Sequence, residues 1–162
     1  MKKLVLVRHA KSSWEHDVTD HQRPLKKRGF KDADMVSNSF KKISLTADFL
    51  ISSDAIRAKT TAEIFISNLN MDESIVRFTH DLYDFSGKSL LRVIKSCDAI
   101  INTLMVFGHN HALTDFVNTY GDKYIDNVPT SGLVIIEFDI DNWKDLKPGK
   151  TCYTLFPRDL KS

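Results

Sequence analysis

Short apolar stretches alternate along this chain with segments of helical periodicity. The stretches are rich in branched and aromatic residues, which favour β-strands, and they cover residues 4–7, 49–51, 75–78, 104–107, 133–138 and 153–156. Between them, side chains recur on one helical face at Phe30, Ala33, Ser37 and Phe40, at Ala58, Ala62, Phe65 and Leu69, at Leu90, Leu91 and Ile94, and at Leu113, Phe116, Val117 and Tyr120. This alternation predicts right-handed crossovers and an α/β fold with a mainly parallel sheet covered on both faces.

The C-terminal part departs from the alternation. The strands predicted at 133–138 and 153–156 have no helical segment between them, so at least one of them should run antiparallel. No linker, low-complexity segment or internal repeat divides the sequence. A length of 162 residues with 42% apolar side chains fits one domain, 1–162.

Charge and composition argue against several classes of partner. The formal net charge is only +2 and both signs are interspersed, so we expect no nucleic-acid partner. No stretch approaches the roughly 20 apolar residues of a membrane span, so we expect no membrane partner. Cys97 and Cys152 lie far apart, without zinc-pair spacing and without enough partners for a disulfide framework. These features predict a cytoplasmic protein.

The candidate chemistry lies where the predicted strands end, because open parallel sheets bind ligands outside the carboxyl ends of their strands. The first strand runs into Arg8 and His9, and the fourth is followed by Gly108 and His109. The second strand leads into a candidate helix cap at 52–54 and then Arg57. A cation in a first helical turn opposes the helix dipole by about 0.3–1 kcal/mol, a penalty that a nearby anion would reverse.

Each of these four residues also has an ordinary structural interpretation, as a salt-bridge partner or a polar loop residue. Together, however, two arginines and two histidines reach one edge of the sheet. The planar fork of arginine binds phosphate oxygens in pairs, so a phosphoryl group is the expected ligand. A metal site is not expected, since the arginines would repel the ion and no carboxylate joins the histidines in ligand spacing.

The same residues carry a family resemblance. The stretch 6–14, Leu-Val-Arg-His-Ala-Lys-Ser-Ser-Trp, resembles the signature of the histidine phosphatase superfamily in its Arg-His-Ala form. The block 52–63 is similar to the second arginine block of that family, and 108–110 to its second histidine block. The residues Arg23-Pro24-Leu25 with Arg28-Gly29 resemble the SixA-type branch of phosphohistidine phosphatases. Four ordered blocks on predicted strand ends are far more specific than one short motif.

The resemblance implies a three-layer α/β/α sandwich and a covalent mechanism without metal or organic cofactor. In that mechanism His9 takes the phosphoryl group, while Arg8, Arg57 and His109 hold its oxygens. Ser12 would help to bind the phosphate or orient the first loop, although hydroxyl groups in turns are often structural. The implied substrate is a phosphorylated protein, such as a histidine-phosphorylated signalling domain, or a small phosphate compound.

The general acid is not identified by any spacing rule. Larger relatives carry an acidic residue after the third strand, and here Asp81 and Asp84 are the candidates as proton donors. Either could instead belong to a polar turn or lie near a helix cap at Ser86. Without an acid, phosphohistidine is the easier substrate, because a ring-protonated phosphohistidine releases neutral imidazole. The alkoxide of an alkyl ester, by contrast, leaves poorly without a proton.

Two alternatives stay open on the sequence. One is a general small-molecule phosphomonoesterase that uses the same four residues, and the other is a noncatalytic module that binds phosphate or phosphoprotein. Glu15 stands where mutase relatives have an asparagine, which argues against mutase activity, and His111 departs from the usual proline. Further polar residues near the expected rim are Lys11, Lys88, Thr130 and Ser131.

Overall fold

The computed structural model describes residues 1–161 and is built around one six-stranded sheet; Ser162, the last residue of the predicted domain, lies outside the described residues. The strands are β1 (Lys2–Arg8), β2 (Phe49–Ser53), β3 (Val76–Thr79), β4 (Thr103–Gly108), β5 (Leu133–Phe138) and β6 (Lys150–Leu155), in the order β3-β2-β4-β1-β5-β6. The pairs β1–β4, β2–β4 and β2–β3 are parallel. The pairs β1–β5 and β5–β6 are antiparallel, which confirms the prediction for the C-terminal strands.

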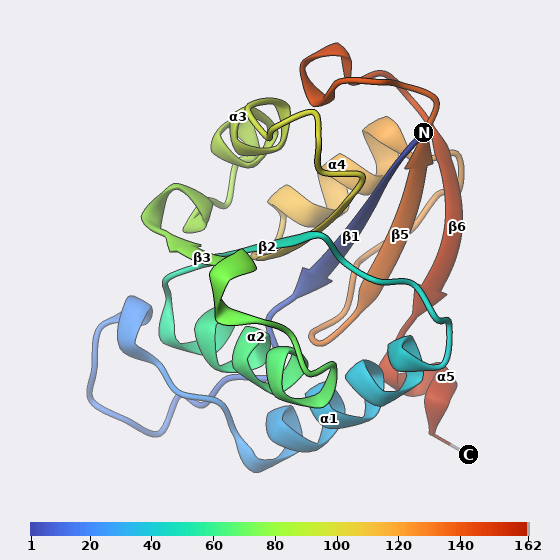
Figure 1. Ribbon diagram of the computed structural model, residues 1–162. Coiled ribbons are helices and arrows are strands. Elements are labelled where there is room, and N and C mark those ends of the chain that lie inside the picture. Colours follow the sequence, from blue (N-terminus) through green and yellow to red (C-terminus); the bar gives the residue numbers. More distant parts are fainter. Residues whose placement is uncertain (162) are drawn as a thin grey trace.

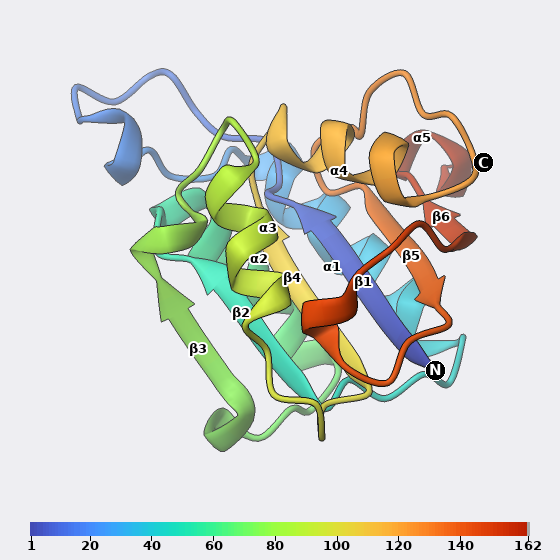
Figure 2. The same ribbon diagram turned by 90° about the horizontal axis from the view of Figure 1, so that it is seen from above.

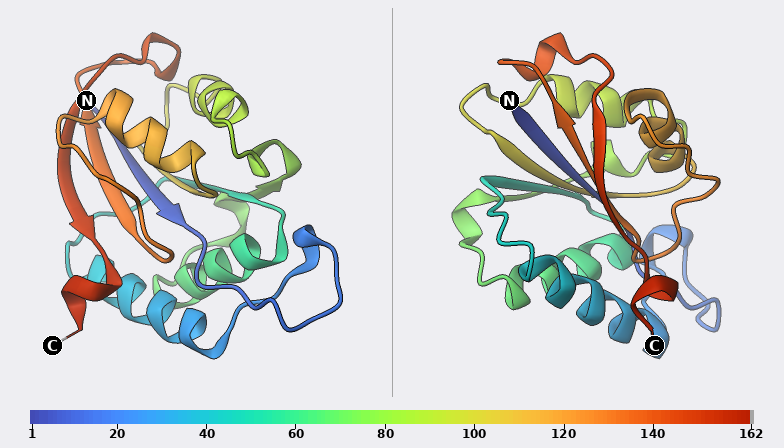
Figure 3. Two further views of the ribbon diagram at one scale, coloured as in Figure 1. Left: turned by 180° about the vertical axis from the view of Figure 1, so that it is seen from behind. Right: turned by 90° about the vertical axis from the view of Figure 1, so that its right-hand side faces the viewer.

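Helices cover both faces of the sheet (Figure 1). The α-helices are α1 (Lys27–Lys41), α2 (Ile56–Asn68), α3 (Lys88–Lys95), α4 (Ala112–Tyr120) and α5 (Pro157–Leu160), with short 3-10 turns η1 (Asp20–Gln22), η2 (Glu73–Ile75), η3 (His80–Leu82) and η4 (Trp143–Asp145). α1, α2 and α5 lie on one side, and α3 and α4 on the other, as both further views show (Figure 3). The predicted three-layer α/β/α sandwich is thereby confirmed. Within residues 1–161, no helix is long and apolar enough to cross a membrane.

The two helical layers enclose separate apolar cores. Leu4 and Leu6 of β1 face the core beneath α3 and α4, whereas Val5 and Val7 face the core beneath α1 and α2. This explains why β1 reads as a continuous apolar run, because each successive side chain is buried on one face or the other. Burial of apolar surface stabilises the fold by about 25 cal/mol per Å², so these two cores contribute most of the favourable free energy of folding.

The buried face of α1 differs at its start from the predicted one. Phe30 was expected beside Ala33, yet its side chain is 48% exposed. Gly29 is buried there instead, and a Cβ at this position would collide with the carbonyl oxygen of Lys11. The buried stripe therefore runs through Gly29, Ala33, Val36 and Phe40, which keeps helical spacing.

Two C-terminal features also escaped the sequence pattern. β6 begins at Lys150, three residues before the predicted start at 153, and most of it is exposed or half-buried. As an edge strand it needs no apolar run, so its first residues are polar. α5 is a single turn of four residues after Phe156, too short to show a periodic pattern.

Candidate active site

The carboxyl ends of three neighbouring strands, β2, β4 and β1, lie at one edge of the sheet (Figure 2). The predicted residues stand at these strand ends or shortly after them. Arg8 of β1 is in register with Gly108 of β4, so His9 and His109 follow side by side. The backbone N–H of His9 donates to Gly108 O at 3.1 Å. β2 lies on the other side of β4 and leads into α2, whose first turn carries Arg57. The four predicted residues therefore converge, as expected for carboxyl ends of parallel strands.

His9 has the geometry of a neutral nucleophile. It is only 7% exposed, and its Nδ1 lies 2.8 Å from the carbonyl oxygen of Ala10. A carbonyl can only accept, so Nδ1 carries the proton and donates, and Nε2 keeps its lone pair. Burial lowers the pKa of His9 well below its usual value; the Ala10 contact opposes this, and the charges of His109, Arg57 and Arg8 add to the lowering. His9 is therefore neutral near pH 7.

His109 is held beside His9 by a serine hydroxyl. The two imidazole rings are 5.2 Å apart between centroids, and His109 Nε2 lies 2.8 Å from Ser53 Oγ. Ser53 Oγ also accepts the N–H of Ala55 at 3.2 Å, which leaves its hydroxyl proton free to donate to Nε2. In that tautomer Nδ1 of His109 carries a proton. Burial, and then the charge of Arg57, lower the pKa of His109 to about 3.

The two predicted arginines are fixed by part of their guanidinium groups. Arg8 Nη1 donates to Val128 O at 2.9 Å. Arg57 is 3% exposed, and it donates through Nη1 to Asp20 O at 2.7 Å and through Nη2 to Asp20 Oδ2 at 3.0 Å. The Nε nitrogen of each guanidinium is buried and has no hydrogen-bond partner in the described part of the chain.

Unpartnered polar atoms are concentrated at this edge of the sheet. Within residues 1–161, the buried side-chain nitrogen and oxygen atoms without a hydrogen-bond partner are Arg8 Nε, Arg23 Nε, Arg57 Nε, His109 Nδ1 and Ser131 Oγ. Each buried donor left unsatisfied costs about 1–3 kcal/mol, so such groups are rare away from functional sites. An oxyanion supplies the acceptors that these nitrogens require. The arrangement therefore suits phosphate.

Asp20 is a prominent site residue that the sequence reasoning missed. Its carboxylate accepts from Arg57 and from the hydroxyl of Tyr83, and Oδ1 lies 3.7 Å from Arg23 Nε. Partial burial alone would raise the pKa of Asp20, but the hydrogen bonds from Tyr83 and Arg57 outweigh it and lower the pKa. One signal was available, because Asp20 precedes the recognised Arg23-Pro24-Leu25 block by three residues.

Ser12 is buried, and its contacts are with Arg23 and Leu25. Its Oγ accepts a hydrogen bond from Arg23 Nη2, and the Arg23 guanidinium carbon lies 3.4 Å from the centroid of the Trp14 ring. Ser12 also forms an isolated bridge with Leu25. These contacts anchor the loop between β1 and α1. A contribution of Ser12 to orienting this loop for catalysis, or to binding phosphate, stays a prediction.

The contacts of Asp84 favour the helix-cap alternative. Its carboxylate accepts the backbone N–H groups of Ser86, Gly87 and Leu90 at 3.0–3.1 Å, at the start of α3. Partial burial raises the pKa of Asp84, but these bonds, led by that from Leu90, lower it overall. Asp81 is exposed, and its backbone N–H donates to Thr79 Oγ1 at 3.2 Å. Within residues 1–161, neither carboxyl group forms a hydrogen bond with His9 or His109.

The rim combines aromatic rings with a buried serine. The rings of Tyr83 and Phe85 lie 5.4 and 5.2 Å from that of His109. Ser131 is fully buried, and its N–H donates to the carbonyl oxygens of Arg8 and His9 at 3.2 and 3.1 Å. Its unpartnered hydroxyl thus lies close to the convergence of the four predicted residues. By contrast, Lys88 and His111 are exposed.

Comparison with known proteins agrees with this geometry. An uncharacterized protein of Mycobacterium tuberculosis is 26% identical over 153 residues, covering 88% of this chain and 93% of the relative. The SixA structure from Agrobacterium tumefaciens superposes with a TM-score of 0.79 at 21% identity, covering 95% of this chain and 97% of the other. A structure of the protein histidine phosphatase SixA complexed with tungstate gives 0.79 at 18% identity, with 98% and 99% covered. At these identities the structural matches establish a shared fold.

The family itself is established by a sequence profile. The profile of the histidine phosphatase superfamily (branch 1) matches residues 4–86, about half of the chain. This region contains Arg8, His9 and Arg57, while His109 lies beyond it. The predicted resemblance is confirmed: the chain belongs to the histidine phosphatase superfamily.

Proposed function

We propose that this protein is a protein phosphohistidine phosphatase in which His9 carries the phosphoryl group as a covalent intermediate. The observation that supports it most strongly is the state of His9, a buried neutral imidazole with Nδ1 bound to Ala10 O and Nε2 free. Around it lie buried donors that lack acceptors, on Arg8, Arg57 and His109. A nucleophile surrounded by anion-binding donors is what phosphoryl transfer requires.

In the first step, His9 Nε2 attacks phosphorus in line with the leaving group. A bond forms between Nε2 and phosphorus while the bond to the substrate nitrogen breaks. Arg8, Arg57 and His109 bind the equatorial oxygens, where charge is greatest in the transition state. A substrate histidine protonated on its other ring nitrogen departs as neutral imidazole. His9 keeps its proton on Nδ1, where it is hydrogen-bonded to the carbonyl oxygen of Ala10. The phosphorylated ring is therefore positively charged and becomes a good leaving group.

In the second step, water attacks phosphorus from the side that the substrate has left. The bond between phosphorus and Nε2 breaks, and neutral His9 is regenerated with its Nδ1 proton. We assign Asp20 as the base that takes one proton from the attacking water, whose other proton leaves with the phosphate. The carboxylate of Asp20 is ionised and lies 3.0 Å from Arg57 Nη2. A positioned base contributes typically about 10²–10⁴-fold to such a proton transfer.

The charges of nearby carboxyl groups favour phosphohistidine over alkyl esters. The pKa values of Asp20, Asp54 and Asp84 are all lowered, in each case by hydrogen bonds that outweigh partial burial. These groups are ionised near pH 7 and have no proton to give to an alkoxide. An imidazole leaving group needs no such proton.

The rim supports a protein substrate, because Trp14 and Phe85 expose 76% and 46% of their surface beside the site and exposed aromatic groups favour protein contacts.

The test measures phosphate release from a histidine-phosphorylated protein and from a panel of small phosphate esters, comparing the wild type with His9→Ala. Selective release that depends on His9 supports the proposal. Release that favours esters would instead indicate a general phosphomonoesterase. Tight phosphate binding without release would indicate a binding module.

A cytoplasmic location belongs to the same proposal and is supported by the two free cysteines, Cys97 and Cys152. Cell fractionation tests this location.

A further inference from the structure

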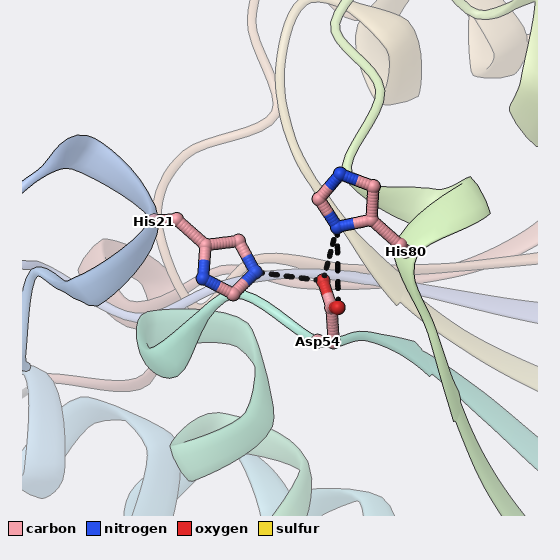
Figure 4. Close-up of side chains that lie close together, drawn as sticks. All are labelled: His21, Asp54 and His80. Atoms are coloured by element: carbon pink, nitrogen blue, oxygen red, sulfur yellow. Dashed lines mark hydrogen bonds and ion pairs between the residues drawn. The ribbon is translucent and has the colours of Figure 1, made fainter.

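Three side chains with metal-ligand chemistry meet beside the candidate active site (Figure 4). His21 Nε2 lies 2.8 Å from Asp54 Oδ1, and His80 Nδ1 lies 3.1 and 3.2 Å from the two oxygens of Asp54. One ligand atom from each residue lies within 4.8 Å of the other two. The two imidazoles point at the same carboxylate from opposite segments, η1 and η3. We propose that these residues form a binding site for Zn²⁺ or a similar divalent ion.

The ligand set and spacing suit zinc. Two imidazole nitrogens and one carboxylate oxygen are a common set for zinc with an open fourth position. Bond lengths of about 2.0–2.2 Å in tetrahedral geometry separate ligand atoms by about 3.3–3.5 Å. The contacts of 2.8 and 3.1 Å, with all three atoms within 4.8 Å, need only small side-chain adjustments to reach this spacing.

A further contact suits His21 as a ligand. Its other ring nitrogen, Nδ1, lies 2.8 Å from the side-chain amide of Gln22. The atom of Gln22 that faces Nδ1 is the amide nitrogen. A flip exchanges the amide oxygen and nitrogen, and the oxygen can then accept a hydrogen bond from Nδ1–H. Nε2 is then deprotonated and faces Asp54. Ligating histidines generally have such a partner on the second nitrogen, which fixes the tautomer.

Two of the three ligands are fixed by the sheet. Ser53 of β2 is in register with Thr79 of β3, so Asp54 and His80 each directly follow a paired residue. His21 comes from the loop between β1 and α1, and it precedes the two other ligands by 33 residues or more. An ion would therefore tie this loop to the sheet edge. The same loop carries Asp20, so the ion would also help to position Asp20 on Arg57.

The local charges permit a cation despite the nearby arginines. The expectation of no metal rested on His9 and His109, where the arginines would repel an ion and no carboxylate joins the histidines in ligand spacing. In the folded chain, Arg57 is paired with Asp20. The ionic partners of Asp54 within residues 1–161 are His21 and His80, with no lysine or arginine among them. The side chains of His21, Asp54 and His80 are 25%, 34% and 71% exposed, so an ion can enter from solvent.

The test is a titration of the full chain with Zn²⁺ alone, followed by calorimetry, with Co²⁺ as a spectroscopic probe. His80→Ala is the main variant, because His80 is largely exposed and its loss should not disturb folding. His16→Ala is the matched control, since His16 is an exposed histidine of the same loop. We expect one equivalent of Zn²⁺ on the wild type and on H16A. Gln22→Ala removes a partner behind a ligand, and such a loss typically costs about 10–100-fold in affinity. H80A removes a ligand itself, so its affinity for Zn²⁺ should fall by at least about tenfold.

Three results would overturn the inference: no stoichiometric binding to the wild type, equal affinity in H80A, or an equal loss in H16A. The first of these would leave the cluster as a hydrogen-bonded tether between η1 and η3. The titration uses no phosphorylated substrate, so its outcome is independent of the proposed phosphatase activity.

Discussion

Replacing Arg57 by alanine should separate activity from stability. The guanidinium of Arg57 has an unpartnered Nε in the described chain, and its charge, like that of Arg8, acts on both His9 and His109. Its loss removes a preorganised donor for the transferring phosphoryl group, which costs about 2.7–4 kcal/mol of barrier, or about 10²–10³ in kcat. Arg57→Lys should recover only part of this, since lysine keeps the charge but lacks the planar fork.

The stability of the same variant should change little. Arg57 forms its ion pair with Asp20, and their side chains are 3% and 43% exposed. Exposed pairs contribute about 0–1 kcal/mol, and although Arg57 is buried, water can replace it on the exposed carboxylate of Asp20. Removing the buried Nε also removes an unsatisfied donor. For a chain of this size, 1 kcal/mol corresponds to roughly 2–4 °C in Tm, so we expect a shift of no more than about 4 °C.

The assay combines single-turnover phosphate release from a phosphohistidine protein with thermal unfolding. Lys59→Ala is the control, because Lys59 is an exposed cation of the same helix; it should keep activity close to that of the wild type. A loss of less than tenfold in Arg57→Ala would refute the reasoning, as would an equal loss in Lys59→Ala. A fall in Tm well beyond 4 °C would show instead that Arg57 mainly supports the fold.

Three further predictions concern other residues of the site. The pKa of His109 is about 3 in the folded chain, against 6.5 for the unfolded residue, so the unfolded state binds more protons between these pH values. The free energy of unfolding should therefore fall as the pH drops from 6.5 towards 3. This loss, measured by urea unfolding, should be smaller in His109→Gln. Asp20→Asn should slow hydrolysis of the intermediate more than its formation, so that radiolabelled phosphoenzyme accumulates; a phosphoenzyme level no higher than in the wild type contradicts the assigned base. Asp84→Ala should lose the cap of α3 and about 0.5–2 kcal/mol of stability by chemical denaturation, with little change in activity per folded molecule; a drop of 100-fold in kcat at unchanged stability would instead support Asp84 as the proton donor.

The order of strands and helices was predictable because each has a local period. Apolar stretches buried on both faces stand out in the sequence, as β1 and β4 do, whereas the exposed edge strand β6 was only partly recognised. The alternation of these elements with helices also dictated parallel strands with coincident carboxyl ends. This rule was sufficient to predict, without knowledge of a single contact, that Arg8, His9, Arg57 and His109 lie at one edge of the sheet. The chemical contributions of these residues stay predictions.

The tertiary structure decided what the loops contribute. Asp20 meets Arg57 across 37 residues, and His21 meets Asp54 across 33; no periodicity links such positions, since the path of an irregular loop depends on long-range packing. The same holds for Asp84, which could have been an acid or a cap until its hydrogen bonds with the start of α3 were seen. The sequence by itself therefore determined the family, the layers and the strand-end residues, because these follow from local pattern and chain topology. Which carboxylate pairs with Arg57, and which histidines share Asp54, depended on how distant segments pack together.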